Sequence, residues 1–422
     1  MALQYRIATL PRSSRRTGLA IATAIVLVLA SAHAAAPVVV LQLHGDQQRL
    51  APRIQAAAED ILAQYAEWFG APPFERLILQ TVPHQQPAPA DQPGHVVVPT
   101  HWLQPERSLL MEADIARALA RQWWGVSVRI DEPFLADGLA EYAQSRAVER
   151  LYDQRHQREA YTTYEARYFG GLLPWAIRAL RLDRATAGVN RGAYRRVPDV
   201  DVRSAEPGLR AARAAKMATA LITLERYIGW PALQRGLALA ADRHRGRTMT
   251  APDFARAMSD AADRDLSWFF DPLFQGPSRW GYAVESIATT PEPNIRCGDV
   301  PCVRSTVVVR RDGNTPFPGT SHQPVGDFES GRAIEVALEF ASGEKVVERW
   351  DGRAETREFI FDAASPVVRA TVDPRHVLMM DLRQANNRRS TEAEPTDPGL
   401  TSWAARWAIW LQDLLLTQAF LY

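Results

Sequence analysis

The sequence predicts an α+β protein, because the hydrophobic pattern changes twice along the chain. Short apolar runs alternate with one helical stretch over residues 37–100, whereas Ala, Leu and Arg dominate residues 108–275 with helical spacing. From about residue 281 the apolar side chains recur at every second position, as in half-buried strands. These changes divide the chain into an α/β part at 37–126, a helical part at 127–280 and a small antiparallel β-sandwich at 281–385.

The composition is that of a folded protein without a nucleic-acid partner. A chain of 422 residues with 46% hydrophobic residues can build two or three packed cores. The 49 Lys and Arg residues nearly cancel the 48 Asp and Glu residues, so the basic excess typical of nucleic-acid binders is absent from the composition.

The first 36 residues have the pattern of a secretory signal. Arg12, Arg15 and Arg16 precede the apolar run GLAIATAIVLVLASA, and small residues follow at 34–36. The run is short for a membrane span, so we expect cleavage rather than an uncleaved anchor. The stretch SRRTGLA is only loosely similar to a twin-arginine signal, since Gly18 stands where a large apolar residue is expected. The sequence therefore predicts an exported, periplasmic or otherwise extracytoplasmic protein.

Individual elements follow from local patterns. In the first part, VVVLQL, LILQTV and HVVVP are predicted strands, and RLAPRIQAAAEDILAQYAEWFG is a predicted helix. In the second part, Thr250 followed by Pro252 and Asp253 marks the start of a helix. In the third part, the predicted strands are STVVVRRDG, AIEVALEFASG, VVERW, REFIFD and VVRATVD, each bounded by turn residues.

The two cysteines, Cys297 and Cys302, lie close together in the stretch CGDVPC. In an exported chain we expect them to form one disulfide across a turn, and in a reducing compartment they would be two thiols. No other cysteine could complete a zinc site with them.

The C-terminal region is predicted to be a linker and a helix. Residues 386–400 are polar and contain Pro and Gly, whereas residues 401–422 are rich in Trp and Leu. On a helical wheel the polar side chains of this last segment gather on one narrow side: Ser402, Arg406, Asp413 and Thr417. Such a helix packs back on the protein, lies in a bilayer interface or spans the bilayer, although a span would have to bury Arg406 and Asp413. We expect it to associate with a membrane.

The stretch ARALARQWWG at 116–125, followed by FLADGLAEY at 134–142, resembles the core of the aminopeptidase N family of zinc peptidases, which belongs to the gluzincins. In that family one helix reads HELAHQWFG or HELAHQWWG, and the next carries WLNEGFAxY. The resemblance extends over most of residues 45–387 and implies a thermolysin-like catalytic domain followed by the β-domain. From the resemblance we expect no counterpart of the large β-domain that usually precedes the catalytic domain.

The resemblance places four catalytic positions of the family on changed residues. Arg117 and Arg121 stand at the two zinc-binding histidines, Ala118 at the general-base glutamate, and Asp137 at the glutamate that is the third ligand. A guanidinium stays protonated and offers no lone pair, so neither arginine can bind zinc, and Ala118 cannot accept a proton. The resemblance therefore identifies a degenerate member of the family, and we expect no cofactor.

Two further differences from the family's sequence pattern also indicate a degenerate catalytic site. The family's GAMEN motif, which holds the substrate's amino terminus, would lie near 84–98, where its glutamate is absent. The family's transition-state tyrosine falls at Ala214, with Lys216 retained and Met217 in place of a glycine. The hydroxyl that stabilises the oxyanion is therefore missing as well.

We predict that ionic pairing has replaced the metal, with Arg117 and Arg121 bound to Asp137 across the two helices. The former cleft would then bind an anionic group through Arg117, Arg121, Asp137 and Lys216. The retained Gln122, Trp123, Trp124 and Gly125 are interpreted as packing between helices.

Two functions remain open from the sequence. The first is a peptidase-like pseudoenzyme that binds a peptide or protein partner at the membrane. The second is an active zinc metallopeptidase with a non-standard site. Histidines for such a site would have to come from His84, His95 and His101, but only His95 and His101 are near each other, and Pro99 interrupts the strand between them.

Overall fold

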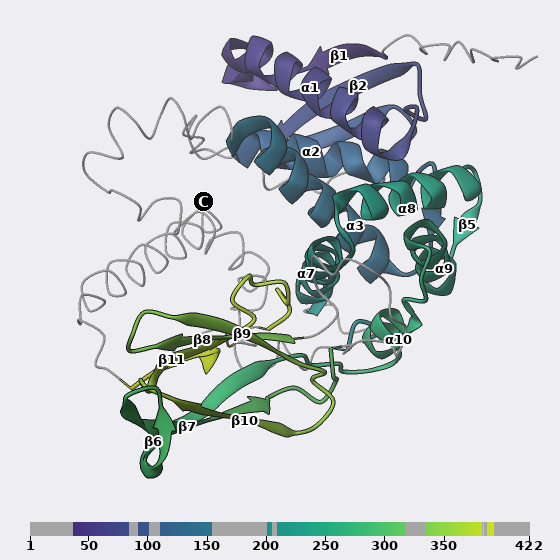
Figure 1. Cartoon of the computed structure of the whole chain (residues 1–422). Coiled ribbons are helices and arrows are strands. Elements are labelled where there is room, and N and C mark those ends of the chain that lie inside the picture. The colour runs from purple at the N-terminus through teal and green to yellow at the C-terminus, as the bar shows by residue number, and fades with distance from the viewer. Residues whose placement is uncertain are drawn as a thin grey trace, which may run out of the picture. The chain divides into compact units, whose positions relative to one another are not determined.

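The computed structural model describes residues 37–83, 92–100, 110–153, 201–204, 209–317, 334–381, 383 and 386–391 (Figure 1). The predicted signal at 1–36 and the predicted apolar helix at 401–422 lie outside these residues. No helix within the described part of the chain is long and apolar enough to cross a membrane.

The first part of the chain forms a small parallel sheet. Strands β1 (Val38–Gln42), β2 (Arg76–Pro83) and β3 (His95–Thr100) lie in the order β1-β2-β3, and both pairs are parallel. A short 3-10 helix (Gly45–Leu50) leads into helix α1 (Ala51–Phe69), which connects the first two strands. The predicted strands and helix of this part are confirmed.

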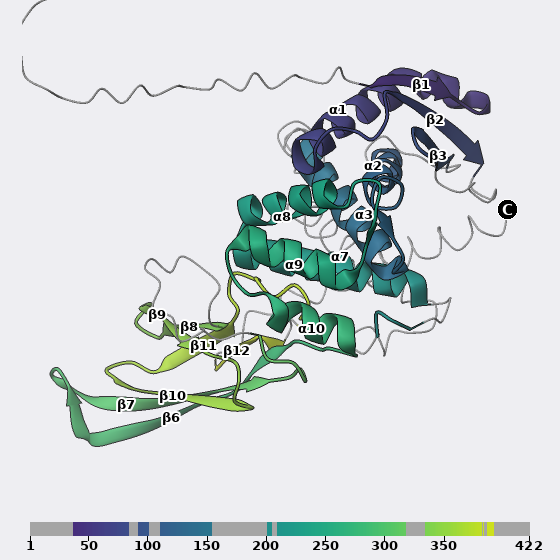
Figure 2. The same ribbon diagram turned by 90° about the vertical axis from the view of Figure 1, so that its right-hand side faces the viewer.

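Helices make up the second part (Figure 2). Helix α2 (Leu110–Trp123) is followed by the two-residue strand β4 (Arg129–Ile130) and helix α3 (Pro133–Val148), which runs into a π-helical turn (Glu149–Asp153). Helices α7 (Arg210–Ile228) and α8 (Trp230–Arg243) precede strand β5 (Thr248–Met249), which pairs with β4. Helices α9 (Ala251–Ala262) and α10 (Ser267–Gln275) follow.

The predicted start of α9 at Thr250 is confirmed by a reciprocal cap. The Thr250 hydroxyl accepts a hydrogen bond from the Asp253 backbone N–H, and the Asp253 carboxylate accepts one from the Thr250 backbone N–H. This arrangement satisfies two N–H groups that the first helical turn leaves without intrahelical partners. The Thr250 hydroxyl also donates to the Asp253 carboxylate at 2.7 Å, and this bond, followed by the one from the Thr250 N–H, holds the pKa of Asp253 below its ordinary value.

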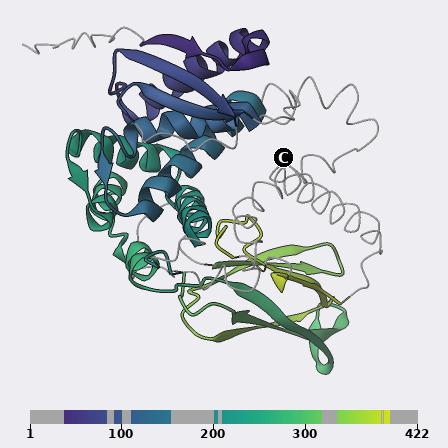
Figure 3. The ribbon, with the colours of Figure 1, turned by 180° about the vertical axis from the view of Figure 1, so that it is seen from behind.

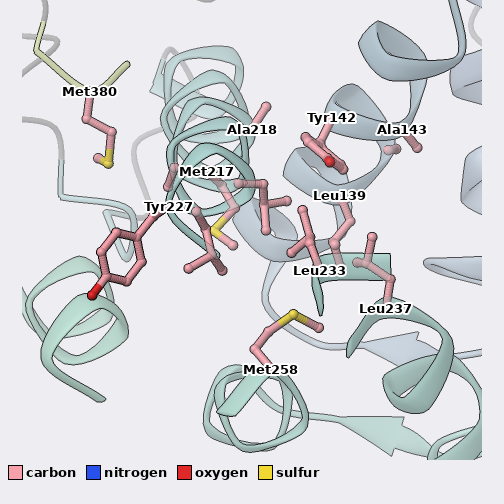
Figure 4. Packing of buried hydrophobic residues seen from close by; sticks show 14 of the residues in the cluster. Leu139, Tyr142, Ala143, Met217, Ala218, Tyr227, Leu233, Leu237, Met258 and Met380 are labelled. Atoms are coloured by element: carbon pink, nitrogen blue, oxygen red, sulfur yellow. The ribbon is translucent and has the colours of Figure 1, made fainter. Parts of the chain in front are cut away.

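Glycines let two pairs of helices approach closely. A Cβ atom added to Gly138 of α3 would lie 2.5 Å from Cβ of Met217 on α7, and one added to Gly236 of α8 would lie 2.7 Å from the end of the Met258 side chain on α9. Figure 4 shows Met217 and Met258 among the buried side chains of these helices, which include Leu139, Tyr142, Leu233 and Leu237.

The third part is a sandwich of two antiparallel sheets (Figure 3). Alternate residues of β8 are buried: Ile334, Val336, Leu338 and Phe340. One sheet has the order β10-β7-β6 and the other β12-β11-β8-β9. The strands are β6 (Tyr282–Cys297), β7 (Val300–Arg311), β8 (Ile334–Phe340), β9 (Lys345–Trp350), β10 (Thr356–Ala363), β11 (Val367–Val372) and β12 (Arg388–Ser390).

The sandwich corrects the sequence prediction at two places. The predicted linker at 386–400 begins too early, because Arg388–Ser390 form β12 and pair with β11. Strand β6 was missed as an element, because Pro291 and Pro293 lie within it and proline breaks the usual strand pattern. The predicted disulfide between Cys297 and Cys302 is confirmed and lies where β6 turns into β7.

Candidate functional site

Gln122, at the end of α2, is fully buried and binds the backbone next to β3. Its Oε1 accepts a hydrogen bond from the Gly94 N–H at 2.9 Å, and its Nε2 donates to the carbonyls of Gln92 at 3.1 Å and His95 at 3.4 Å. Gly94 has a φ of +68°, and an added Cβ would lie 2.4 Å from the Arg76 carbonyl oxygen. Gln122 therefore fixes a tight turn at the start of β3, and its contacts go to the sheet rather than to a neighbouring helix.

Trp123 and Trp124 are buried against α1. The Trp123 ring packs edge-on against Tyr65 and Phe69, and its Nε1 donates to the Gly70 carbonyl at 3.2 Å. The Trp124 ring packs edge-on against Phe69, and its Nε1 is buried without a partner in the described part of the chain. The indoles thus hold α2 on α1, which agrees with the predicted packing role.

The side chain of Asp137 lies buried at the junction of α2, α3 and α7. One carboxylate oxygen accepts a hydrogen bond from Arg210 Nε of α7 at 2.7 Å, and the other lies 3.6 Å from Arg121 Nη1 of α2. The Asp137 side chain is only 6% exposed, whereas those of Arg121 and Arg210 are 37% and 58% exposed. One buried carboxylate therefore joins three helices through two guanidinium groups that reach solvent.

Arg117 pairs with a different residue from the one that the sequence predicted. Its Nη2 lies 3.7 Å from Oε2 of Glu141, one helical turn beyond Asp137 on α3. Arg117 and Arg121 are four residues apart, as are Asp137 and Glu141, so each pair shares one helix face. The two antiparallel faces meet as a ladder of two ion pairs, Arg121 with Asp137 and Arg117 with Glu141.

Ala118 and Ala214 contribute no chemistry to the site. Ala118 is partly buried against the hydrophobic core, and Ala214 on α7 is fully buried. A Cβ added to Gly138 would lie 3.2 Å from the Ala214 carbonyl oxygen, so this part of α7 lies directly against the helix turn that carries Asp137. Position 214, where the resemblance places the family's tyrosine, carries only a methyl group.

Lys216, two residues further along α7, is buried, and its ammonium donates to the Ser278 carbonyl at 2.8 Å. This bond ties α7 to the segment before β6. The hydrogen bond from Arg203 is the main cause that lowers the pKa of Asp201, and the charge of Lys216 makes a smaller contribution.

The four residues that the resemblance places at the zinc chemistry, Arg117, Ala118, Arg121 and Asp137, do not fit a zinc ion. Two guanidinium groups and a methyl group offer no ligand, and the Asp137 carboxylate is bound by Arg210. Within the described residues there is also no group of three or more His, Cys, Asp or Glu side chains that could hold a metal ion. His95 lies on β3 with its ring 3.1 Å from the Gln80 side chain, while His84 and His101 lie outside the described residues.

A second polar network joins α3 to α7 further along both helices. The Tyr142 hydroxyl donates to Glu225 Oε2 at 2.6 Å, and Arg146 forms an ion pair with the same carboxylate. The Arg146 guanidinium also lies over the Trp230 ring, 3.8 Å from its centroid. Burial raises the pKa of Glu225, and burial followed by the charge of Glu225 raises the pKa of Tyr142.

The raised pKa of Glu225 predicts a pH dependence of stability. The folded protein keeps the Glu225 proton to higher pH than the unfolded chain does. The free energy of unfolding therefore falls as the pH rises from the pKa of Glu225 in the unfolded chain to its raised pKa in the folded protein. Glu225→Gln removes this contribution. Denaturant unfolding between about pH 4 and about pH 7 should show the wild type losing more stability than the variant as the pH rises. Glu67→Gln, at an exposed position on α1, is the matched control and should behave like the wild type. If the free energy of unfolding changed equally with pH in the wild type and in Glu225→Gln, the prediction would be contradicted.

The sequence prediction missed Glu141 and Arg210. Glu141 had a usable signal, because it follows Asp137 at the same four-residue spacing that separates Arg117 from Arg121. Arg210 had none, because it lies 73 residues from Asp137 in the chain.

Comparison with known proteins identifies the fold. No family model matches the sequence, and no curated protein matches it. The structure is similar to the crystal structure of Legionella pneumophila aminopeptidase A in complex with aspartic acid, with a TM-score of 0.51 and 15% sequence identity over 79% of this chain. The match covers 35% of the aminopeptidase, so the chain spans about a third of the length of that protein. The chain therefore has a peptidase-like fold.

Proposed function

We propose that this protein is an exported peptidase-like pseudoenzyme that has lost zinc and catalysis and binds a peptide or protein partner at a membrane. The observation that carries the proposal is the ladder of ion pairs between α2 and α3, together with Arg210 on Asp137. In the zinc peptidases that the sequence resembles, the positions of Arg117, Arg121 and Asp137 hold the metal. Here they hold guanidinium groups and carboxylates that bind one another.

The charges of the site favour an anionic ligand. Three guanidinium groups and two carboxylates meet there, from Arg117, Arg121, Arg210, Asp137 and Glu141. The guanidinium groups are the more exposed members of these pairs, so the positive charge faces solvent. The structurally similar aminopeptidase was crystallised with aspartic acid, an anionic amino acid, and binding of an anionic group is the part of that behaviour we propose for this chain.

Export and membrane association rest on the sequence alone. The signal-like pattern at 1–36 supports export, and the Trp-rich apolar segment at 401–422 supports association with a bilayer.

Zinc content of the purified full-length protein tests the central claim. We expect no zinc to remain after dialysis against a weak chelator, and no hydrolysis of aminoacyl or peptide substrates. A variant carrying Arg117→His, Ala118→Glu, Arg121→His and Asp137→Glu restores the family's ligand set and should take up about one zinc ion per chain. Adding Arg210→Gln should strengthen uptake, because Arg210 binds the carboxylate at position 137 in the wild type.

The matched control carries Arg235→His and Arg357→His, which place two new histidines on exposed parts of α8 and β10. It should bind no zinc. Stoichiometric zinc in the natural protein would overturn the proposal and would favour an active zinc metallopeptidase with a non-standard site. The zinc content of the natural protein can be measured whether or not the variants fold.

A further inference from the structure

The outer faces of the two sheets of the β-sandwich differ in charge. Figure 2 shows β8, β9, β11 and β12 in one layer and β6, β7 and β10 in the other. On the four-stranded sheet the charged side chains that point away from the core are mostly basic: Lys345, Arg349, Arg369 and Arg388, with Glu335 and Glu339. On the three-stranded sheet they are mostly acidic: Glu285, Glu292, Glu358 and Asp362, with Arg304 and Arg310. A negatively charged partner is therefore attracted to the four-stranded sheet and repelled by the other.

Each of the two glutamates on the four-stranded sheet lies between two basic residues. Glu339 forms an ion pair with Arg369 at 2.7 Å and stands opposite Lys345 in the register of β8 and β9. In the same way, Glu335 lies 3.0 Å from Arg375 and stands opposite the arginine of β9. One carboxylate is thus shared by two cations in both places, which leaves the β9 side of this face positive.

Strand β9 forms an edge of this sheet and presents an exposed row of side chains. Within the residues that the structure describes, it pairs only with β8. Lys345 and Arg349 are exposed on its outer face, and they flank Val347, which is 54% exposed. A partner that lies along β9 therefore meets a basic, an apolar and a basic side chain at alternate positions.

The hairpin turn between β8 and β9 fixes which backbone groups face the open edge. The Phe340 N–H donates to the Glu344 carbonyl at 2.9 Å, and the register continues in pairs from there. In an antiparallel ladder every second residue bonds to the same neighbour, so the residues two, four and six positions after Glu344 bond to β8. The backbone N–H and C=O groups of Lys345, Val347 and Arg349 therefore point to the open edge, where an extended segment can pair with them.

The other edges of the sandwich are less suited to pairing with an acidic segment. Strand β6 contains Pro291 and Pro293, which lack an N–H group, and β12 is only three residues long. Strand β10 presents Glu358 and Asp362 to solvent. A second copy of β9 is also disfavoured, because antiparallel pairing of two such edges would place basic side chains opposite one another.

We propose that an extended acidic segment of a partner protein adds to the four-stranded sheet as an antiparallel strand along β9. Backbone hydrogen bonds to Lys345, Val347 and Arg349 hold the segment, as in other cases of strand addition. Two carboxylates at alternate positions pair with the lysine and the arginine, and an apolar residue between them covers the valine. This inference goes beyond the proposed function, because the surface lies outside the former zinc site and does not depend on the loss of zinc.

Binding of two matched peptides to the full-length protein tests the charge requirement. The first is acetyl-Thr-Glu-Thr-Val-Thr-Glu-Thr-amide, and the second has glutamine in place of both glutamates. At constant ionic strength we expect the glutamine peptide to bind at least tenfold more weakly. The variant Lys345→Glu with Arg349→Glu should weaken binding of the acidic peptide at least tenfold. The control variant Arg247→Glu with Arg264→Glu, at exposed positions of the helical part, has the same net charge and should leave binding unchanged.

N-methylation of the peptide tests strand pairing without altering the protein. With its valine opposite Val347 in an antiparallel pair, the N–H groups of the valine and the glutamates face β9, whereas those of the threonines face solvent. A methyl group on the valine nitrogen should weaken binding at least tenfold. A methyl group on the nitrogen of the threonine before it changes the same backbone property and should have little effect.

Four results would each overturn the proposal. They are no binding of the acidic peptide, equal binding of the two peptides, undiminished binding to Lys345→Glu with Arg349→Glu, and equal effects of the two methyl groups. If vesicles of phosphatidylglycerol bind in place of the peptide and lose binding in this variant, the basic face is a membrane surface and the proposal also fails. The zinc content of the natural protein is a separate readout, so a failure of the proposed function can be told from a failure of the β9 surface.

Discussion

Trp123→Ala is expected to reduce the free energy of unfolding by about 3–5 kcal/mol, the usual cost of removing a large buried aromatic side chain. The Trp123 ring is 1% exposed and packs against Tyr65, Phe69 and Phe74, all on the α1 side of α2. The alanine variant would leave a cavity between α1 and α2 and would leave the Gly70 carbonyl without its indole donor. The loss would be measured by denaturant unfolding, monitored by far-ultraviolet circular dichroism of the backbone rather than by tryptophan fluorescence.

Two phenylalanine variants separate packing from hydrogen bonding. Trp123→Phe keeps most of the ring contacts but loses the bond from Nε1 to the Gly70 carbonyl, whereas Trp124→Phe removes an N–H that is buried without a partner. A hydrogen bond contributes about 0.5–1.5 kcal/mol net, and an unsatisfied buried donor is itself costly. Trp124→Phe should therefore cost less than Trp123→Phe, and the reverse order would contradict this account of the two indoles.

The secondary structure was predictable wherever one local pattern decided it. Strands such as β8 alternate buried and half-buried residues, so the period of two was visible in the sequence. Thr250 and Asp253 form a cap within four residues, which is also local information. Strand β6 was missed because its prolines contradict the strand pattern and only its pairing with β7 makes it a strand.

The site was predictable in its residues but only partly in its contacts. Arg117, Arg121 and Asp137 came from the resemblance and the helical spacing, and the structure brings Arg121 to Asp137. The pairing of Arg117 with Glu141 depends on the register in which α3 packs along α2, and the sequence of neither helix specifies this register. Arg210 depends on the close approach of α7 to α3 at Gly138, and such tertiary contacts have no local signal.

Gln122 has a structural role of its own. Its side chain satisfies backbone groups of Gln92, Gly94 and His95, so it stabilises the start of β3. Arg117 and Arg121, on the preceding turns of α2, instead form ion pairs with α3 and reach solvent. The stretch QWWG is therefore explained by its contacts within the fold.

Asp137→Asn tests whether ionic pairing stabilises the three-helix junction. Asparagine has the same shape but presents at most one acceptor oxygen, so Arg121 and Arg210 can no longer share a negative charge. Hydrogen bonds to charged groups contribute about 1.5–3 kcal/mol. We expect a loss of free energy of unfolding near the lower end of this range, because both guanidinium groups are partly exposed and can turn to water.

A double-mutant cycle with Arg210→Gln assigns the loss to the ion pair rather than to general disruption. Arg210 and Asp137 are 2.7 Å apart at their closest atoms, so the two substitutions together should cost less than the sum of the single costs. The control is the same cycle with Arg243→Gln and Asp260→Asn, an exposed pair between α8 and α9 where little coupling is expected. If Asp137→Asn instead stabilised the protein, the desolvation of the carboxylate would outweigh its pairing, and the guanidinium groups could not be regarded as a structural replacement for a metal.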